Sequence, residues 1–399
     1  MMSVLVIKGG VIAVCAVLAF GALAMPAYGG GPNQVEWTFA LYMSSGGDLD
    51  SWGDYSMDLL KSVDTSKSVN FLAFWDKTDG PANLYKITEG TMTELTDFAY
   101  NGMEVNMGDP KILSAYFSYV SSKHKAPHII LDMWGHGDDI RGMCKDTDTG
   151  TDVDVDYISH AELGDVLAGK HVDVIAVDAC GVGIIEAAHE YTIRGVTAEW
   201  FVAGENYVPL QGFQYDEIGK DLVANPAMTP EQLSKDIVMR YQDYYQGGWL
   251  TELSAIRLSA VPKVVDELWD VTSILMKEMD TYRGLIASAK GHARMGWSQY
   301  GWEQFVDFPT VFEDIYSVAP KGSSLKIQTG ELLDAIEEAV AYIGTSSPGY
   351  VWDFGGIAVF FPSSYKSMTS NWNLYGELYP DLAFAQDGWL DFLMAFWGK

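Results

Sequence analysis

The sequence contains few cysteines and few basic residues. Three of its 399 residues are cysteine, which excludes a fold built on a framework of disulfide bonds. The 25 Lys and Arg residues are outnumbered by 54 Asp and Glu residues, which gives a net charge of −29. A chain this negative repels phosphate backbones and attracts cations, so it argues against nucleic acid as a partner and for cationic substrates. The chain also lacks His-Glu-x-x-His and Cys-x-x-Cys spacings, which argues against a zinc enzyme.

Long apolar runs are absent beyond the N-terminus. Residues 1–27 contain Lys8, then an apolar stretch that ends in small residues, as is typical of a secretory signal peptide. No later stretch is long and apolar enough to span a bilayer. The sequence therefore predicts a secreted or extracytoplasmic protein with a flexible leader at 28–35. Membrane attachment is expected only if the N-terminal segment stays uncleaved.

Removal of that segment leaves two cysteines, Cys144 and Cys180. One interpretation is that they pair with each other in an oxidising environment. The other is a free, reactive thiol that is kept for chemistry.

Apolar stretches alternate with helical patterns from residue 36 to about residue 229. Hydrophobic residues make up 48% of the chain and charged residues 20%, which allows a sizeable buried core. Parallel strands covered on both faces appear as continuous apolar runs, so the alternation predicts an α/β fold with a mostly parallel sheet and helices on both faces. The expected strands are 37–44, 69–76, 126–135, 172–179 and 199–205, and the expected helices are 109–124, 160–169 and 183–193.

Residues 230–399 have a different pattern, dominated by long helices with one apolar face. These helices are expected at 229–245, 261–279 and 330–343. We therefore divide the chain into a core at 36–229 and a mainly helical C-terminal region at 230–399. The apolar stretch 355–362 is expected to return a strand from this region to the fold.

Two of the expected strands end in reactive side chains. The strand 126–135 is followed by His136 and Gly137, and the strand 172–179 is followed by Cys180. Ligands bind at the carboxyl ends of parallel strands, so His136 and Cys180 are expected to face each other across one edge of the sheet. A thiol beside an imidazole can attack a carbonyl carbon, with the imidazole accepting and returning the proton. Without this pairing, the two residues would be an ordinary core cysteine and a structural histidine.

The backbone near these residues has its own expected roles. Gly137 lets the main chain approach the substrate closely, and its N–H, with that of Cys180, could donate to the developing oxyanion. A helix directly after Cys180 would favour its thiolate.

Four stretches, in chain order, resemble the clostripain family of cysteine peptidases, which belongs to the caspase-like clan. They are WTFALYMSSGGDLDSW, LDMWGHGDD, VDVIAVDACGVGIIEAAHE and FVAGENYVPLQGFQYD. The resemblance runs from about residue 36 to the C-terminus. It implies a caspase-like fold, with His136 as general base and Cys180 as nucleophile. The sequence departs from the family at Gly135 and at Glu205-Asn206, so the loop after the fifth strand is not expected to contribute to the S1 pocket.

The resemblance also implies a role for Asp178. In the family, the acidic residue two positions before the cysteine lies at the floor of the S1 pocket. Asp178 would then bind a P1 Arg or Lys, and Arg is expected to be preferred because a planar guanidinium can make two hydrogen bonds to a carboxylate. The alternative is that Asp178 caps the following helix or holds a loop.

An acidic segment lies between the histidine and the cysteine. Asp146, Asp148 and Asp152 surround Gly150 at spacings that suit oxygen ligation of Ca²⁺. Some family members need calcium, although the chemistry itself requires no cofactor. The alternative is a merely solvated acidic loop.

Family members can also be activated by self-cleavage between the histidine and the cysteine. The basic candidates in this interval are Arg141, Lys145 and Lys170. Lys145 opens the acidic segment, so we expect it to be the most exposed of the three.

The sequence thus predicts a secreted cysteine endopeptidase that cleaves peptides or proteins after Arg or Lys, with Arg preferred. A different hydrolase or a transpeptidase with the same dyad is the nearest alternative. The alternative from another class is a catalytically silent secreted or surface binding module on a caspase-like fold.

Overall fold

The structure of the protein is a computed structural model. It describes residues 35–64, 68–78, 80–248, 250–293, 304–346, 354–370 and 375–399. The predicted signal peptide and nearly all of the predicted leader lie outside the described residues. Within the described ranges, no helix is long and apolar enough to cross a membrane.

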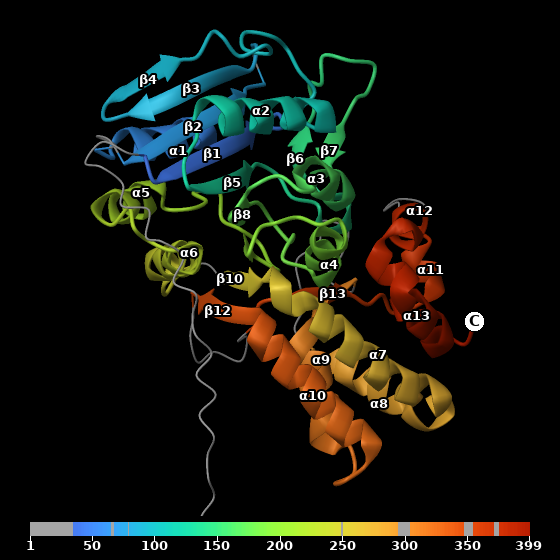
Figure 1. Cartoon of the computed structure of the whole chain (residues 1–399). Helices are drawn as coiled ribbons and strands as arrows, with labels where there is room; N and C mark the ends of the chain where they lie inside the picture. Colours follow the sequence, from blue (N-terminus) through green and yellow to red (C-terminus); the bar gives the residue numbers. More distant parts are fainter. Residues whose placement is uncertain are drawn as a thin grey trace, which may run out of the picture.

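A central sheet organises the molecule (Figure 1). Among the described residues it has nine strands. In order across the sheet they are β12 (Val340–Thr345), β10 (Glu252–Arg257), β9 (Trp200–Ala203), β8 (Val174–Asp178), β5 (His128–Trp134), β1 (Trp37–Ser44), β2 (Val69–Asp76), β3 (Asn83–Thr88) and β4 (Thr91–Glu94). The central strands β9, β8, β5, β1 and β2 pair in parallel, and antiparallel strands extend both edges. The predicted sheet with a parallel centre is confirmed.

Helices cover both faces of this sheet, which explains why its central strands are buried and mostly apolar. All eight residues of β1 are buried. Phe39 and Leu41 belong to the core formed with α1 (Asp50–Lys61), α5 (Tyr215–Ala224) and α6 (Pro230–Tyr245). Ala40 and Tyr42 point to the other face, into the core formed with α2 (Pro110–Lys123), α3 (His160–Leu167) and α4 (Ile185–Ile193). Successive side chains of a strand point to opposite faces, so one strand supplies both cores.

The helices begin where the sequence provides capping residues. Asp109 accepts a hydrogen bond from the N–H of Lys111 at 2.9 Å, and Pro110 occupies the first turn of α2. Ser159 and Glu162 form a capping box at the start of α3.

The C-terminal region contributes more to the sheet than the sequence predicted. The expected helix 330–343 is corrected at its end, because α10 (Ser324–Ala339) stops at Ala339 and the next six residues form β12. These residues pair antiparallel with β10, another strand that the sequence did not reveal. Tertiary pairing therefore overrides the helical periodicity at this point.

The expected strand 355–362 is present as β13 (Ala358–Phe360), but it joins a small sheet. It pairs with β11 (Phe305–Asp307). Its first residue also bridges Ile184, and the N–H of Ala358 donates to the carbonyl of Gly183 at 2.9 Å. The C-terminal region thereby braces the chain that follows Cys180.

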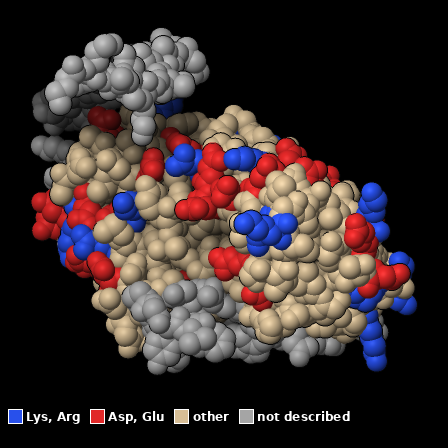
Figure 2. All heavy atoms as spheres, turned by 90° about the horizontal axis from the view of Figure 1, so that it is seen from below, with Lys and Arg blue, Asp and Glu red and all other residues tan. Residues whose placement is uncertain are grey.

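The remaining helices form a group beyond β10 and β12, below the sheet in the view of Figure 1, with α11, α12 and α13 to the right. They are α7 (Val261–Lys277), α8 (Met279–His292), α9 (Phe308–Val318), α10, α11 (Tyr365–Met368), α12 (Tyr375–Leu378) and α13 (Leu390–Trp397). Helix α10 packs on α7 and α9, and α8 packs on α9. On the face in Figure 2, acidic and basic side chains are interspersed, so the net negative charge is not gathered into one patch there.

Candidate active site

His136 follows β5 by two residues. Gly135, between them, has a φ of +144° and lies so close to Ser44 that a Cβ would come within 2.5 Å of the Ser44 carbonyl oxygen. The turn at Gly135 places the imidazole of His136 at the carboxyl edge of the sheet, where Nε2 lies 2.6 Å from Oδ1 of Asp48.

Asp48 is a site residue that the sequence reasoning missed. It belongs to the loop after β1, the strand next to β5 in the sheet. Gly46 in the same loop has a φ of +55°, and a Cβ there would lie 3.1 Å from the imidazole ring of His136. The signal was present as Ser-Gly-Gly-Asp at the end of a buried strand, but sequence alone did not indicate which strand lies beside it.

Cys180 follows β8, the strand on the other side of β5. Its Sγ accepts a hydrogen bond from the N–H of Val208 at 3.4 Å and lies 3.6 Å from the carbonyl oxygen of Val208. Burial raises the pKa of the Cys180 thiol to about 11. The expected helix 183–193 is present as α4, but it begins at Ile185, so Cys180 does not begin a helix as expected. The thiol therefore lies outside the first turn of a helix and gains no thiolate stabilisation from one.

Gly137 brings the two strand ends together. A Cβ at this position would overlap the carbonyl oxygen of Cys180 and lie 3.0 Å from its backbone nitrogen. The sequence predicts a close approach of Gly137 to the substrate, whereas the structure shows a close approach of Gly137 to the backbone of Cys180. Any residue larger than glycine would push the His136 loop away from Cys180.

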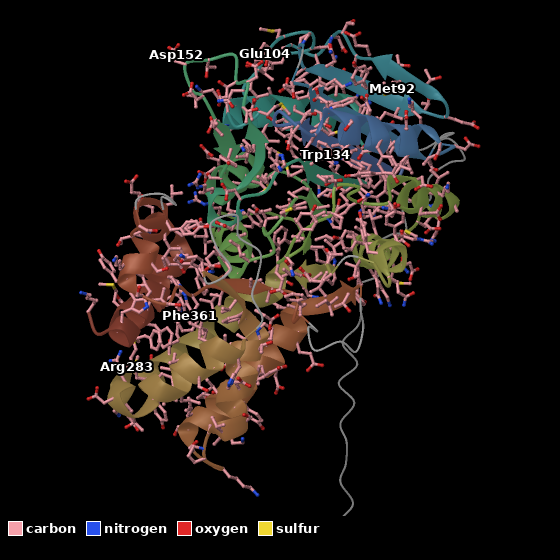
Figure 3. All side chains as sticks on the ribbon, turned by 180° about the vertical axis from the view of Figure 1, so that it is seen from behind. Met92, Glu104, Trp134, Asp152, Arg283 and Phe361 are labelled. Atoms are coloured by element: carbon pink, nitrogen blue, oxygen red, sulfur yellow. The ribbon has the colours of Figure 1, made fainter. Side chains whose placement is uncertain are left out.

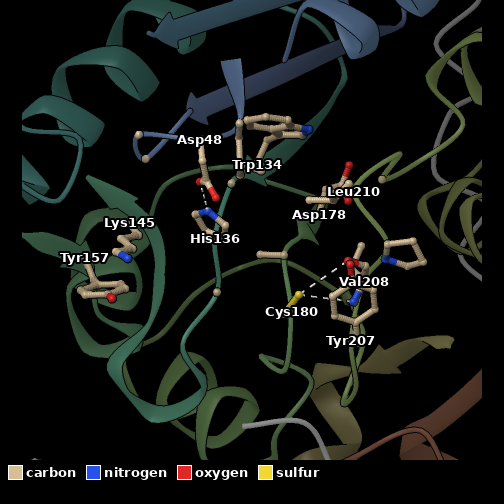
Figure 4. A pocket seen from close by; sticks show the side chains of 18 residues that line it. Asp48, Trp134, His136, Lys145, Tyr157, Asp178, Cys180, Tyr207, Val208 and Leu210 are labelled. Carbon is tan, nitrogen blue, oxygen red and sulfur yellow. Dashed lines mark hydrogen bonds and ion pairs between the residues drawn. The ribbon is translucent and has the colours of Figure 1, made fainter. Parts of the chain in front are cut away.

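A cavity of about 400 Å³ lies at this edge of the sheet. Figure 4 shows its lining side chains, with His136 beside Asp48, and Cys180 beside Val208. The residues that matter for its chemistry are Asp48, His136, Lys145, Asp178, Cys180 and Tyr207. The structure therefore places the predicted histidine, cysteine and aspartate around one hollow large enough for a peptide side chain.

Asp178 is buried at this cavity, with 4% of its surface exposed. Its Oδ2 accepts hydrogen bonds from the N–H of Phe213 at 2.9 Å and from the hydroxyl of Tyr215 at 3.0 Å. Burial raises the pKa of Asp178 to about 6. Through these hydrogen bonds Asp178 holds the loop that precedes α5. It does not cap the helix that follows it, because the N-cap of α4 is Ile184.

Glu205 and Asn206 turn away from the cavity. The Glu205 carboxylate is buried and accepts a hydrogen bond from the N–H of Gly356 at 2.9 Å. The backbone N–H of Asn206 donates to Glu252 at 3.0 Å. These contacts fix the start of the loop after β9 to the C-terminal region. The same loop continues into Tyr207, Val208 and Leu210, which line the cavity, so the expectation that this loop would not contribute to the pocket is wrong.

The acidic segment does not bring its three predicted ligands together. Asp146 is buried, and its two oxygens accept hydrogen bonds from the N–H groups of Met107 at 2.7 Å and Asp148 at 2.9 Å. Asp152 is exposed at the outer end of the loop (Figure 3). Within the described part of the chain, no group of three or more His, Cys, Asp or Glu side chains is arranged to hold a metal ion.

Lys145 lies in a different setting from the one expected. It belongs to β6 (Met143–Asp146), which pairs with β7 (Asp156–Ile158), and its half-buried side chain lines the cavity. Its carbonyl oxygen accepts a hydrogen bond from the hydroxyl of Ser44 at 2.7 Å. The expectation of an exposed Lys145 is therefore wrong, because strand pairing holds it against the site.

The two described cysteines are both free. The thiol of Cys144 is fully buried and points at the carbonyl oxygens of Trp134 and Tyr42, at 3.6 and 3.7 Å. Cys180 packs against Val208 instead. The interpretation that the two cysteines pair is not supported by this arrangement.

Comparison with known proteins identifies relatives. The model of the clostripain family matches residues 42–343. Clostripain from Hathewaya histolytica is 25% identical over 315 residues, which cover 67% of this chain and 59% of that protein. The chain thus matches less than two thirds of the length of this curated relative.

Solved structures share the fold. An inactive zymogen C11 protease from Parabacteroides distasonis superimposes with a TM-score of 0.68 at 18% identity, covering 90% of this chain and 99% of that one. A secreted C11 cysteine protease from Bacteroides thetaiotaomicron, solved in complex with an irreversible peptide inhibitor, gives 0.68 at 14% identity, covering 90% and 100%. The expected caspase-like architecture is confirmed by these matches.

Proposed function

Because the chain belongs to the clostripain family, we propose that it is a cysteine endopeptidase in which His136 and Cys180 cleave peptide bonds after basic residues. One observation carries the proposal. The two residues follow neighbouring parallel strands, β5 and β8, and line one cavity with a buried carboxylate, Asp178.

The proposed hydrolysis proceeds through a thioester on Cys180. His136 takes the thiol proton of Cys180, and the thiolate attacks the carbonyl carbon of the scissile bond. The N–H groups of Gly137 and Cys180 stabilise the oxyanion that forms. His136 then gives its proton to the leaving amine as the C–N bond breaks, and a water molecule hydrolyses the thioester to regenerate the thiol.

This mechanism requires a rearrangement at Cys180. With its pKa raised to about 11, Cys180 holds a proton at neutral pH, and its sulfur contacts Val208. In the proposed mechanism, substrate binding turns the sulfur toward a proton acceptor in the cavity. His136 is the acceptor that the cavity offers, and the hydrogen bond to Asp48 orients its ring and stabilises the imidazolium that forms.

Asp178 is the proposed selector of the P1 residue. A buried carboxylate at the cavity attracts one cation, and a planar guanidinium can use two N–H groups on it. The overall negative charge of the chain favours the approach of basic peptides. We expect Arg to be preferred to Lys.

Self-processing and calcium binding are separate proposals, and the mechanism depends on neither. Cleavage after Lys145 requires that β6 leave its partner β7, since the bond lies within this pair. Prolonged incubation of the wild type, Lys145→Ala and Lys170→Ala, followed by a reducing gel and N-terminal sequencing, tests it. Fragments that begin at Asp146 and vanish only in Lys145→Ala support the proposal, and a chain that stays intact contradicts it.

Secretion is also proposed for this chain. The support comes from the signal-like residues 1–27 and from the Bacteroides thetaiotaomicron protein that is described as secreted. Expression with and without residues 1–27, followed by detection in the medium and the cell, tests this location.

The decisive experiment compares fluorogenic peptides with Arg, Lys, Asp, Asn or Leu at P1, under reducing conditions, with and without Ca²⁺. The wild type is expected to cleave after Arg and Lys, and Cys180→Ala is expected to be inactive. Cleavage after other residues would retain the dyad and remove Asp178 as the selector. Hydrolysis of esters but not of peptides, lost in Cys180→Ala, would favour a hydrolase other than a peptidase that uses the same dyad.

A second function has one observation in its favour. The thiol of Cys180 is protonated and engaged with Val208, as expected of a catalytically silent binding module. An Arg-containing chloromethyl ketone distinguishes the two. Covalent labelling of Cys180 supports the peptidase, and absence of labelling together with absence of cleavage supports the binding module.

A further inference from the structure

Two buried carboxyl groups share one phenol beneath the cavity. The hydroxyl of Tyr215 lies 2.8 Å from Oδ2 of Asp132 and 3.0 Å from Oδ2 of Asp178. Asp132 is fully buried in β5, and Tyr215 at the start of α5 is 1% exposed. Of the three side chains, only Asp178 lines the described cavity. A P1 side chain would therefore meet Asp178 and not the other two.

The number of available protons decides which of the two carboxyl groups is ionised. A phenol has one proton and can donate to only one of the two carboxyl groups. Asp178 also accepts from the N–H of Phe213, whereas Oδ1 of Asp132 has no hydrogen-bond partner among the described residues. Asp132 is the more deeply buried of the two carboxyl groups and leaves one oxygen without a hydrogen bond, so the proton that completes the network belongs on Asp132. Burial and the charge of Asp178 both raise the pKa of Asp132 well above its usual range.

We propose that Asp132 and Tyr215 are specificity-determining positioning residues. Protonated Asp132 donates to the Tyr215 oxygen, and the Tyr215 hydroxyl donates to Asp178, which stays an anion. We call this chain of hydrogen bonds from Asp132 through Tyr215 to Asp178 the relay. It rests on the proposed function, because it acts through binding of the P1 cation to the Asp178 carboxylate. It leaves one negative charge beneath the cavity, which matches the single charge of an Arg or Lys side chain.

The groups whose charges interact with Asp178 are acids: Asp132 from β5, Tyr215 from α5, Tyr241 and Tyr245 from α6, and Cys180. Two basic side chains, His136 and Lys145, line the same cavity. Among the described residues, no Lys or Arg forms an ion pair with Asp178. The hydroxyl of Tyr215 and the N–H of Phe213 are therefore its stabilising donors, and a bound guanidinium would be its first cation.

Tyr215→Phe tests the relay, because it removes the donor and keeps the ring. We expect the preference for P1 Arg over P1 Leu to fall about tenfold or more, since hydrogen bonds to charged groups are strong. The change should appear as a higher KM for Arg substrates, with kcat within about threefold of the wild-type value. In the wild type, half of the Arg preference should be lost near the pKa of Asp178, about 6, and in Tyr215→Phe this midpoint should lie at higher pH.

Tyr245→Phe is the matched control. Tyr245 is also a buried phenol, and it donates at 2.9 Å to the carbonyl of Gly212, in the same loop. A merely structural role of Tyr215 predicts the same loss of selectivity in both variants, whereas the relay predicts a loss only in Tyr215→Phe. Equal losses would overturn the proposal.

Asp132→Asn provides the second arm. Its amide N–H can donate to Tyr215 as a protonated carboxyl does, so the loss of P1 Arg preference and the shift of the pH profile should be smaller than in Tyr215→Phe. If Asp132 carries the charge instead, its removal shifts the pH profile of Arg preference to lower pH, and the assignment of the proton is wrong.

Binding of agmatine, a small guanidinium compound, to Cys180→Ala distinguishes failure of the relay from failure of the proposed function. Calorimetry should show binding that weakens about tenfold or more when Tyr215→Phe is added. The proposed function fails if Cys180→Ala does not bind agmatine and the wild type does not cleave after Arg. If both occur and Tyr215→Phe alters neither, the relay fails and the proposed function stands.

Discussion

The carboxylate of Asp48 lies 2.6 Å from Nε2 of His136, although 88 positions separate the two residues. The contact arises because β1 and β5 are parallel neighbours, so the loops after them meet at one edge. The site thus has a carboxylate behind its general base, supplied by a loop that holds no other part of the proposed chemistry.

Replacing Asp48 with Asn should lower kcat about tenfold, with little change in KM. The neutral amide keeps a hydrogen bond but no longer stabilises the imidazolium. The effect is smaller than for a buried partner, because 73% of the Asp48 side chain is exposed. Steady-state kinetics with a P1 Arg substrate measures it. Asp54→Asn is the control, since Asp54 pairs with Lys77 away from His136, and an equal loss there would contradict the role of Asp48.

Alkylation of Cys180 should be slow at neutral pH and accelerate with pH. The thiolate is the reactive form, and burial raises the pKa of this thiol to about 11. The rate with iodoacetamide should therefore rise about tenfold per pH unit between pH 7 and 10. Cys144, fully buried, should stay unmodified in the folded protein. Mass spectrometry of digested samples follows both sites. A rate for Cys180 that is independent of pH would show that the free enzyme already holds a thiolate.

Gly212→Ala should impair recognition of basic P1 residues. Gly212 has a φ of +60°, and a Cβ there would overlap the carboxylate of Asp178. The methyl group should push Asp178 away and raise KM for Arg substrates about tenfold or more. Gly195→Ala is the matched control, because Gly195 has a φ of +74° with open space around it. It shares the backbone strain of about 1 kcal/mol but should keep the P1 preference.

Asp76→Asn should stabilise the protein above neutral pH. Burial, and then the charges of Asp146 and Glu104, raise the pKa of Asp76 from 3.8 to about 9. The folded state then holds a proton that the unfolded state has lost, so stability falls as pH rises from about 4 to 9. The variant lacks this penalty, and its advantage should reach the order of 2–4 kcal/mol at pH 7, since one pKa unit is about 1.4 kcal/mol.

Denaturant unfolding at pH 5, 7 and 9 measures this difference. Asp64→Asn is the control, because Asp64 is exposed. The stability gain of Asp76→Asn should grow between pH 5 and 9, and that of Asp64→Asn should stay near zero. A gain that is constant with pH would show that Asp76 is ionised at little cost in the folded protein.

Much of the site could be predicted because it depends on local patterns. Continuous apolar runs that end in glycine-flanked polar residues identified the strands before His136 and Cys180, and the parallel rule placed both ends at one edge. The prediction failed where a local pattern has two structural outcomes. The sequence predicts that a helix begins directly after Cys180, but the chain first turns at Gly181 and then bridges Ala358 through Ile184, so α4 begins at Ile185. Likewise, Lys145 opens an acidic segment, but β6 holds it at the cavity.

The sequence by itself determined the sheet with a parallel centre, the family, and the His136, Asp178 and Cys180 positions, because each depends on residues close together in the chain. Only the tertiary structure decided which distant groups complete the site. Asp48 reaches His136, Tyr215 reaches Asp178, and Val208 contacts the thiol of Cys180 through the order of strands in the sheet and the path of the loops between them. Strand order is fixed by packing across the whole core, and no local pattern of residues encodes it.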